Sequence, residues 1–529
     1  MTQDNKQDNK QDNKQDNKQD NNAQQTLTRE EARRLAGQLV MIRMPITSLD
    51  DVSAQFLKDN YIRGICLFRQ NMVDEIQLKK LTADLRLILG EGALIGIDQE
   101  GGAVVRSTWV PQPPAAMSLG ASDDTELCRQ VGAAVARGVK ALGFNWNFAP
   151  VLDLNNNVDN PVISERSFGS DPKRASELAL AWMDGSLAEG VACCVKHFPG
   201  HGDTNVDSHR DLPTVNKSLA ELQALELAPF QTAVSRNAPA MMTAHIVYPA
   251  LDAENPATMS KPILTGLLRD QWNYQGVVIT DGMDMHAIAG RYGVGNAAVR
   301  ALLAGADMVM ALGTTETQLE TLNALTEVIL SGQISLAEVQ QKLQRMADLT
   351  KAYPCIDTAY QTDMADRILM SSAWKRGLTT QGNAQPPAKG SKLRLIISAD
   401  VVSDGVSEAG IPAAKVSAML ASLYDVDTVT FNNADSFDWS ALPDDGRFVV
   451  LASTVRIRYS KQVRNTWKPD LHLVLWNPFQ MLDIQAPALI TYGFAPPAID
   501  AARAWFAAEV VASGQIPVAG FSTAAVVQA

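Results

Sequence analysis

The chain has 529 residues, of which 46% are hydrophobic and 20% are charged, a composition typical of globular proteins. This length exceeds what one ordinary hydrophobic core organises, so we expect at least two domains. The formal net charge of −12 and the pI near 5.1 argue against nucleic acid or an anionic membrane as the main partner. A small neutral ligand suits this charge better.

The cysteines and the apolar segments indicate a cellular compartment. There are five cysteines, an odd number, and Cys193 and Cys194 are adjacent inside an apolar run. This pattern predicts reduced, buried thiols instead of a disulfide framework. No stretch reaches the roughly 18 apolar residues of a membrane span, and the N-terminus lacks the apolar core of a signal peptide. We therefore expect a cytoplasmic protein without a membrane span, whose oligomeric state the sequence does not specify.

The chain begins with a polar leader. The tetrapeptide Gln-Asp-Asn-Lys repeats from Gln3 to Lys18 and offers no apolar residue that a core could bury. Residues 1–27 are therefore predicted to be a disordered low-complexity segment. Thr28 and Glu31 have the spacing of a capping box and predict that the first helix, and with it the ordered chain, begins here.

From residue 28 onward, short apolar runs alternate with stretches of helical periodicity such as Glu75–Leu89 and Glu126–Ala141. Eight of the apolar runs have the length and composition of buried parallel strands. They are Leu39–Arg43, Gly64–Phe68, Leu94–Asp98, Asn145–Val151, Val191–His197, Met241–His245, Val277–Asp281 and Met308–Leu312. Eight strands interleaved with helices predict a TIM-like (β/α)8 barrel, which together with the helices after it occupies residues 28–378.

A second domain is expected after the barrel. Residues 379–392 are rich in Gly, Pro, Gln and Lys, have no periodicity, and are predicted to be a linker. Residues 393–529 contain five further apolar runs and a helical pattern over Ala498–Ala512, which predict a smaller α/β domain with a mostly parallel open sheet. No glycine fingerprint opens a helix there, so no motif marks a nucleotide site.

Ionisable residues stand where the predicted barrel strands end. They are Asp98, Glu100, Lys196, His197, His245 and Asp281. Because the C-terminal ends of barrel strands meet at one mouth, we expect these side chains to converge on a single site.

Three of the six histidines, His197, His201 and His209, fall in one segment after the fifth strand, where Pro199 excludes a continuous helix. In one interpretation, Asp207 orients His209, which exchanges protons with a substrate. In a second, the three histidines and an Asp bind a metal ion. In a third, these residues only hold the shape of the loop. The spacing alone leaves all three open.

The segment Lys196–Thr204, which reads Lys-His-Phe-Pro-Gly-His-Gly-Asp-Thr, is followed by Asp207-Ser208-His209. It closely resembles the signature of the β-N-acetylglucosaminidases of glycoside hydrolase family 3, a subgroup that carries an Asp–His dyad as its acid/base. Further family features occur in order at residues 97–102, 147–153, 166–169, 243–245 and 278–285. The resemblance covers about residues 28–353.

The resemblance implies roles for individual residues. Asp281 matches the family nucleophile, His209 the general acid/base and Asp207 the partner of His209. The positions that match those binding the hydroxyls of the terminal sugar are Asp98, Arg106, Arg166, Lys196 and His197. Carboxylates accept, and Arg and Lys donate, the hydrogen bonds that a sugar ring can make.

Neighbouring residues are alternatives or companions in these roles. Asp284 is the alternative nucleophile. Glu100 is a candidate second catalytic carboxylate, although the two glycines after it favour support of a tight loop. His245 is expected to line the pocket, with a purely structural hydrogen bond as an equal alternative. His201 is expected to shape the loop.

The implied reaction is hydrolysis with retention of configuration. Asp281 attacks the anomeric carbon while His209 protonates the departing oxygen, and water activated by His209 then releases the sugar. The expected substrates are peptidoglycan fragments or chitin oligosaccharides with a terminal N-acetylglucosamine, and neither a cofactor nor a metal is implied. Phosphorolysis is an alternative, because a neutral histidine repels phosphate less than a carboxylate would. Two further alternatives are a β-glucosidase and a sugar-binding protein with an inactive site.

Overall fold

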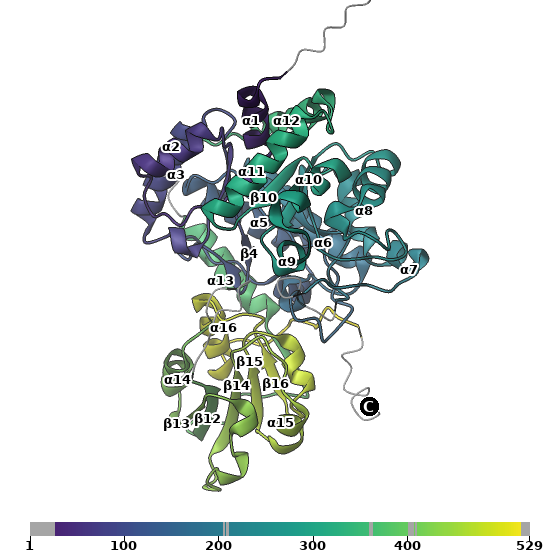
Figure 1. Ribbon diagram of the computed structural model, residues 1–529. Helices are drawn as coiled ribbons and strands as arrows, with labels where there is room; N and C mark the ends of the chain where they lie inside the picture. The colour runs from purple at the N-terminus through teal and green to yellow at the C-terminus, as the bar shows by residue number, and fades with distance from the viewer. Residues whose placement is uncertain are drawn as a thin grey trace, which may run out of the picture.

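The computed structural model describes residues 27–204, 207, 211–358, 363–399, 407 and 410–519. These residues form a closed barrel, in the upper part of Figure 1, and a six-stranded open sheet with its helices below it. The leader predicted over residues 1–27 lies outside the described residues except for Leu27. The first helix, α1 (Arg29–Gln38), begins with the predicted capping box of Thr28 and Glu31.

Eight parallel strands close the barrel. They are β1 (Val40–Ile42), β2 (Gly64–Cys66), β3 (Leu94–Ile97), β6 (Trp146–Asn147), β7 (Ala192–Phe198), β8 (Ala240–Thr243), β9 (Val277–Gly282) and β10 (Met308–Ala311). They follow one another around the barrel in chain order, and β10 pairs with β1 to close it. The strands are buried on both faces, which is why they read as continuous apolar runs. The TIM-like barrel is confirmed, and each of the eight predicted runs overlaps one of its strands.

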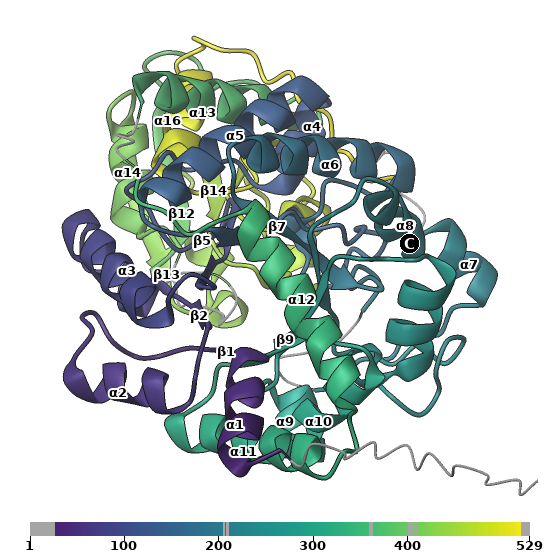
Figure 2. The same cartoon turned by 90° about the horizontal axis from the view of Figure 1, so that it is seen from above.

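Helices surround the strands, as the view from above shows (Figure 2). In chain order they are α2 (Asp51–Asp59), α3 (Glu75–Leu89), α4 (Ala116–Ser122), α5 (Thr125–Ala141), α6 (Pro172–Ala188), α7 (Leu219–Ala224), α8 (Leu227–Ser235), the π-helix η4 (Pro262–Gln271), α9 (His286–Tyr292), α10 (Val294–Ala304), α11 (Thr315–Leu330) and α12 (Leu336–Ala352). None of the helices in the described part of the chain is long and apolar enough to cross a membrane.

A short antiparallel hairpin follows β3 at the barrel mouth. Its strands are β4 (Gln99–Gly101) and β5 (Val104–Val105). The turn needs glycine, because Gly101 and Gly102 have φ of 125° and 59°. A Cβ on Gly101 would also lie 2.2 Å from the carbonyl oxygen of Pro114. The hairpin carries Glu100 towards the barrel axis.

The second domain is built on the sheet β11-β16-β15-β14-β12-β13. Its strands are β11 (Thr379–Gln381), β12 (Lys392–Ser398), β13 (Asp425–Phe431), β14 (Phe448–Ser453), β15 (Leu471–Val474) and β16 (Ala488–Ile490), and its helices are α14 (Ala413–Ala421), α15 (Lys461–Thr466) and α16 (Pro496–Phe506). All neighbouring strands are parallel except β11, which pairs antiparallel with β16. The mostly parallel open sheet is confirmed.

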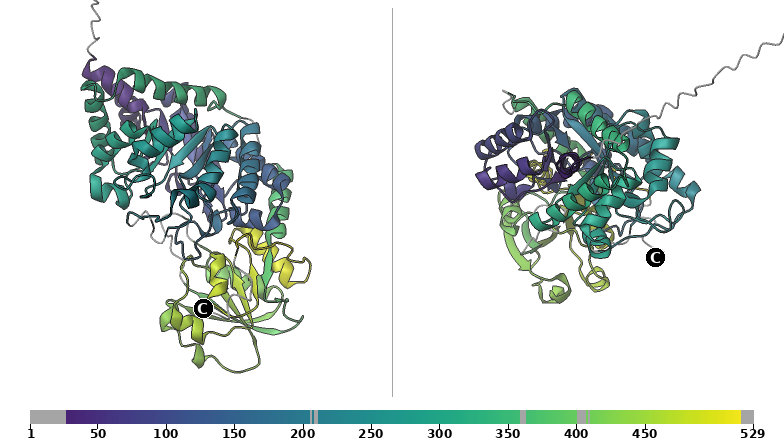
Figure 3. Two further views of the ribbon diagram at one scale, coloured as in Figure 1. Left: turned by 90° about the vertical axis from the view of Figure 1, so that its right-hand side faces the viewer. Right: turned by 45° about the horizontal axis from the view of Figure 1, so that its top comes forward.

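The start of the expected linker, residues 379–392, was predicted wrongly. Thr379–Gln381 form the edge strand β11, and the hydroxyl of Tyr492 donates a 2.9 Å hydrogen bond to Thr379 Oγ1. The β-branched Thr-Thr pair suits such an edge strand. Before it, α13 (Met364–Gly377) packs against α4 and α5 of the barrel and against α16 of the second domain. Figure 3 shows the second domain lying directly against the barrel.

Candidate active site

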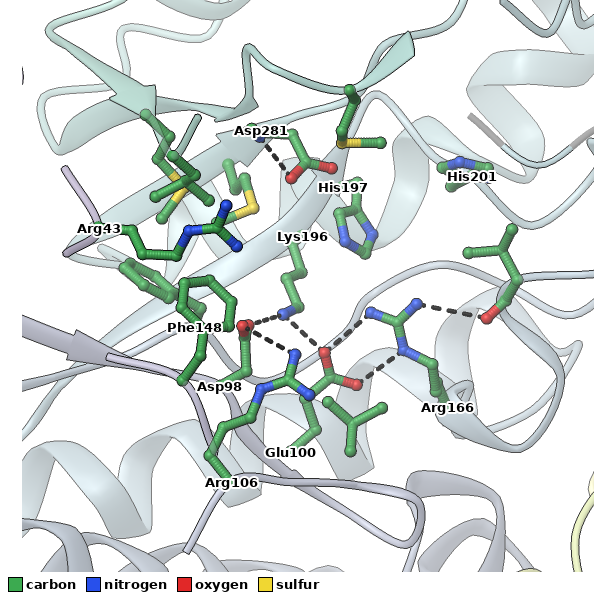
Figure 4. Close-up of a pocket in the computed structure, with 18 of the residues that line it drawn as sticks. Arg43, Asp98, Glu100, Arg106, Phe148, Arg166, Lys196, His197, His201 and Asp281 are labelled. Carbon is green, nitrogen blue, oxygen red and sulfur yellow. Dashed lines mark hydrogen bonds and ion pairs between the residues drawn. The ribbon is translucent and has the colours of Figure 1, made fainter. Parts of the chain in front are cut away.

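A cavity of about 190 Å³ opens at the C-terminal ends of the barrel strands. The sequence-predicted residues that line it are Asp98, Arg106, Arg166, Lys196, His197 and Asp281. Glu100, His201 and Asp284 also line it, and apolar walls come from side chains such as Phe148 and Val162. In Figure 4, Asp281 and His197 lie on one side of Lys196, and Asp98 and Glu100 on the other. The expected convergence at one mouth is therefore present for Asp98, Glu100, Lys196, His197 and Asp281, but not for His245, which the cavity walls do not include.

Lys196 joins two carboxylates at the base of this cavity. It is the fifth residue of β7 and only 2% exposed. Its Nζ lies 2.8 Å from Asp98 Oδ1 and 2.6 Å from Glu100 Oε1. Arg106, which follows the β4–β5 hairpin, donates from Nη2 to Asp98 Oδ2 at 3.3 Å. Asp98 is thus held between two cations (Figure 4).

Glu100 holds Arg166 through a bidentate contact. Arg166 Nε donates to Glu100 Oε2, and its Nη2 to Glu100 Oε1, both at 2.8 Å. Such paired contacts fix the plane of a guanidinium group as well as its position. The sequence favours loop support for Glu100. The structure gives it the further task of orienting Lys196 and Arg166 at the cavity, a task that could not be read from neighbours along the chain.

The network stays ionised at neutral pH. Burial would raise the pKa of Asp98, but Lys196 and Arg106 hold that pKa below its usual value. Burial acts in the same way on Glu100, and Arg166 and Lys196 hold its pKa well below the usual range. For Lys196, burial would lower the pKa, yet Asp98 and Glu100 raise it. The carboxylates are therefore acceptors and the cations donors when a polar ligand enters.

Asp153 fixes the ring of His197. Its Oδ2 lies 2.6 Å from His197 Nδ1, and its Oδ1 accepts backbone hydrogen bonds from His197 at 3.1 Å and His201 at 2.6 Å. Burial would raise the pKa of Asp153, and the adjacent His197 lowers it below its usual value. Because Nδ1 bonds to Asp153, Nε2 is the ring nitrogen with which His197 can contact a ligand in the cavity. The sequence indicates Asp153 only as part of a family motif, and its contact is a site feature that sequence reasoning missed.

His201 is held inside the loop, as expected. Its Nδ1 lies 2.9 Å from Thr204 Oγ1, and burial lowers its pKa to about 4. The rings of His197 and His201 meet edge to face at 5.9 Å. Among the described residues, no group of three or more His, Cys, Asp or Glu side chains is arranged to hold a metal ion. The metal interpretation also needed His209, which lies outside the described residues.

Two carboxylates near the end of β9 line the cavity. Asp281 belongs to the strand, and its Oδ1 accepts a 2.7 Å hydrogen bond from the backbone N–H of Gly282. Asp284 lies on the turn after the strand and is exposed. The position of Asp281 is therefore fixed by the barrel, and that of Asp284 by a surface turn.

Comparisons with known proteins identify the family of this chain. Residues 32–349 match the family described as the glycosyl hydrolase family 3 N terminal domain. The chain belongs to glycosyl hydrolase family 3. It is 32% identical over 393 residues to Beta-hexosaminidase A of Pseudoalteromonas piscicida. The match covers 69% of this chain and 63% of that protein, so the chain spans less than two thirds of the length of this relative. It is 36% identical to a Beta-hexosaminidase of Thiobacillus denitrificans, covering 54% of this chain and 81% of that one.

A solved structure extends the likeness to both domains. A family 3 β-N-acetylglucosaminidase from Paenibacillus sp. str. FPU-7 superposes with a TM-score of 0.84 at 31% identity, covering 92% of this chain and 98% of that one. The family 3 chain described here thus belongs among the glycosyl hydrolases.

The segment after β7 carries the two remaining predicted catalytic residues of this family 3 enzyme. The backbone carbonyl of Asp207 accepts a 3.1 Å hydrogen bond from Asp211, and His209 lies outside the described residues. Farther along the chain, Lys217 Nζ lies 2.9 Å from Asp203 Oδ2 and also contacts Glu226.

His245 takes the structural alternative of the two that the sequence left open. Its Nδ1 lies 2.8 Å from Thr258 Oγ1 and its Nε2 lies 2.9 Å from the carbonyl oxygen of Gly282. The side chain is buried, and the cavity walls do not include it. Because both ring nitrogens face protein groups, His245 links β8 to the end of β9 and so supports the position of Asp281.

Proposed function

We propose that this family 3 hydrolase is a retaining exo-β-N-acetylglucosaminidase. The observation that carries the proposal is the placement of Asp281 on the same cavity as the Asp98–Lys196–Glu100–Arg166 network. A cavity of about 190 Å³ suits one terminal sugar residue, which corresponds to exo action. The similarity to proteins named β-hexosaminidase and β-N-acetylglucosaminidase supports the N-acetylglucosamine specificity.

The buried charges supply the groups that grip the sugar. Asp98 accepts hydrogen bonds from hydroxyl groups, while Lys196, Arg106 and Arg166 donate them. His197, oriented by Asp153, adds a further polar contact. These side chains are held by one another before substrate arrives, so little side-chain ordering is left to be done on binding.

The chemistry follows double displacement. Asp281 attacks the anomeric carbon, and the carbon–oxygen bond to the leaving group breaks as His209 delivers a proton to that oxygen. Asp207 orients the imidazole of His209. In the second half, His209 takes a proton from water, whose oxygen displaces Asp281 and restores the original configuration.

Peptidoglycan fragments and chitin oligosaccharides are the natural substrate classes we propose. A cytoplasmic location is proposed as well, supported by five cysteines that are all free and of which four are buried. Cell fractionation with an antibody to the chain checks the location.

The test compares 4-nitrophenyl N-acetyl-β-glucosaminide with the matching glucoside, with and without phosphate. Burying the acetamido group against polar partners, which a glucoside leaves unpaired at about 1–3 kcal/mol each, predicts a preference of roughly tenfold to several hundredfold. Equal rates would overturn the specificity, and accumulation of a sugar 1-phosphate would establish phosphorolysis instead. Muropeptides and chitobiose assayed side by side then rank the natural substrates.

A second measurement separates the histidine acid from the metal interpretation. His209→Ala should slow substrates with poor leaving groups far more than activated phenyl glycosides, since only the former need a proton. A strong chelator should leave the rate of the wild-type enzyme unchanged. Loss of activity on chelation, restored by zinc, would instead support the metal site.

A further inference from the structure

The segment Val162–Arg166 lies between the cavity and the second domain. Its two ends, Val162 and Arg166, line the cavity. Its centre contains Ser164 and Glu165, both completely buried, within the short 3-10 helix η2 (Ser164–Arg166). Arg166 is also bonded to this segment, because its Nη1 donates to the carbonyl oxygen of Val162 at 3.3 Å. Whatever holds the centre of the segment therefore holds Arg166.

Two side chains of the second domain hold Glu165. Arg456 Nη2 donates to Glu165 Oε1 at 3.0 Å, and Trp476 Nε1 donates to the same oxygen at 2.9 Å. Arg456 Nη1 also donates to the carbonyl oxygen of Val162 at 2.9 Å, and its guanidinium packs over the Trp476 ring at 5.5 Å. Val162 thus accepts hydrogen bonds from an arginine of the cavity and from one of the second domain.

The backbone of this segment is strained where the second domain touches it. Ser164 has φ of 40°, a conformation that residues with a side chain rarely adopt. Such a backbone persists when surrounding contacts over-determine it, and such sites cluster where ligands bind. Here the contact is again from the second domain, since Ser164 Oγ lies 3.0 Å from Asn477 Oδ1.

The residues that make these contacts stand at one end of the second sheet. Arg456 follows β14, and Trp476 and Asn477 follow the neighbouring parallel strand β15. The loops at the carboxyl ends of parallel strands are where open α/β sheets usually carry functional groups. In this chain those loops face η2 of the barrel domain.

We propose that Arg456 and Trp476 are positioning residues of the active site. Through Glu165 and the Val162 carbonyl they hold the segment that presents Arg166 to the sugar, so the second domain completes the substrate-binding wall of the barrel. The inference rests on the proposed function, in which Arg166 contacts the terminal sugar.

The experiment measures kcat and KM of Arg456→Met on 4-nitrophenyl N-acetyl-β-glucosaminide, with Arg458→Met as the matched control. Arg458 also joins the second domain to the barrel, with Nη1 3.1 Å from Asp159 Oδ1 and 3.2 Å from the Val158 carbonyl oxygen, so its barrel contacts precede the Val162–Arg166 segment. Arg456→Met should raise KM at least tenfold with kcat within about threefold, because Arg166 binds the sugar before as well as during reaction. Arg458→Met should leave KM within twofold.

Two further variants keep the test decisive if Arg456→Met folds poorly. Trp476→Phe keeps the aromatic ring and removes the N–H donor, and should raise KM threefold or more. In an Arg166→Met background, Arg456→Met should add less than a twofold change, because the residue it positions is gone. An Arg456→Met KM equal to that of Arg458→Met, or full additivity with Arg166→Met, would overturn the inference. An inactive wild-type enzyme with this substrate would instead overturn the proposed function.

Discussion

Replacement of Glu100 by Gln tests the charge network at the base of the cavity. The carboxylate accepts three short hydrogen bonds, two from Arg166 at 2.8 Å and one from Lys196 at 2.6 Å. A glutamine at this position would keep one acceptor oxygen and lose the charge, leaving three cations facing the single carboxylate of Asp98. Removing one partner of a buried ion pair typically costs about 3–5 kcal/mol. We expect the free energy of unfolding to fall by about 3 kcal/mol, at the lower end of this range.

The same change should weaken catalysis, since Lys196 and Arg166 lose the group that orients them. A loss of roughly 3 kcal/mol in transition-state binding corresponds to about a hundredfold lower kcat/KM. Urea unfolding and the chromogenic assay measure the two effects. The control is Glu126→Gln on α5, which breaks an exposed ion pair with Arg129 and should change the stability far less, because solvent screens such a pair. Equal effects of the two substitutions would refute the reasoning.

Two other contacts lead to predictions. Asp153→Asn removes the charge that holds His197 Nδ1. Because a buried charged hydrogen bond worth about 3 kcal/mol is lost, kcat/KM in steady-state kinetics should fall about a hundredfold. An unchanged kcat/KM would show that the orientation of His197 does not matter. Burial lowers the pKa of His201 to about 4 and of His472 to about 3, so between pH 6.5 and these values the unfolded chain binds more protons and stability falls as the pH falls. Each histidine should lower the free energy of unfolding by roughly 2 kcal/mol at pH 5 relative to pH 7.5. His472→Gln should remove about half of the combined pH dependence of the two histidines in urea unfolding, whereas a pH dependence equal to the wild type's would contradict this prediction.

The barrel could be predicted because its strands leave a strong imprint on the sequence. In a strand buried on both faces, such as β9 (Val277–Gly282), three successive apolar residues precede the polar residues Thr280 and Asp281. The extent of a strand is less evident. The run Asn145–Val151 contains only the two-residue strand β6, and beyond it pairing with the next strand resumes as an isolated bridge between Val151 and Lys196.

Contacts between distant segments escaped prediction. The role of Glu100 depends on Arg166, 66 positions away, and that of Asp153 on His197, 44 positions away. The β4–β5 hairpin that presents Glu100 is too short to show a periodicity. Strand β11 was assigned to the linker for the same reason, and the contacts of Arg456 with the barrel follow only from the packing of the two domains. Family resemblance supplied roles for Asp281, Asp207 and His209, but not the groups that hold their surroundings.

The measurement that tests the central claim most directly is covalent labelling of the nucleophile. A 5-fluoro N-acetylglucosaminyl fluoride forms the glycosyl-enzyme quickly, because its anomeric fluoride is a good leaving group. It releases the enzyme slowly, because the fluorine at C5 destabilises the oxocarbenium-like transition state of the second step. After proteolysis, mass spectrometry should place the label on Asp281, and Asp281→Ala should remain unlabelled. A label on Asp284 or Asp98, or an unlabelled enzyme that releases product of inverted configuration from its substrate, would contradict the account.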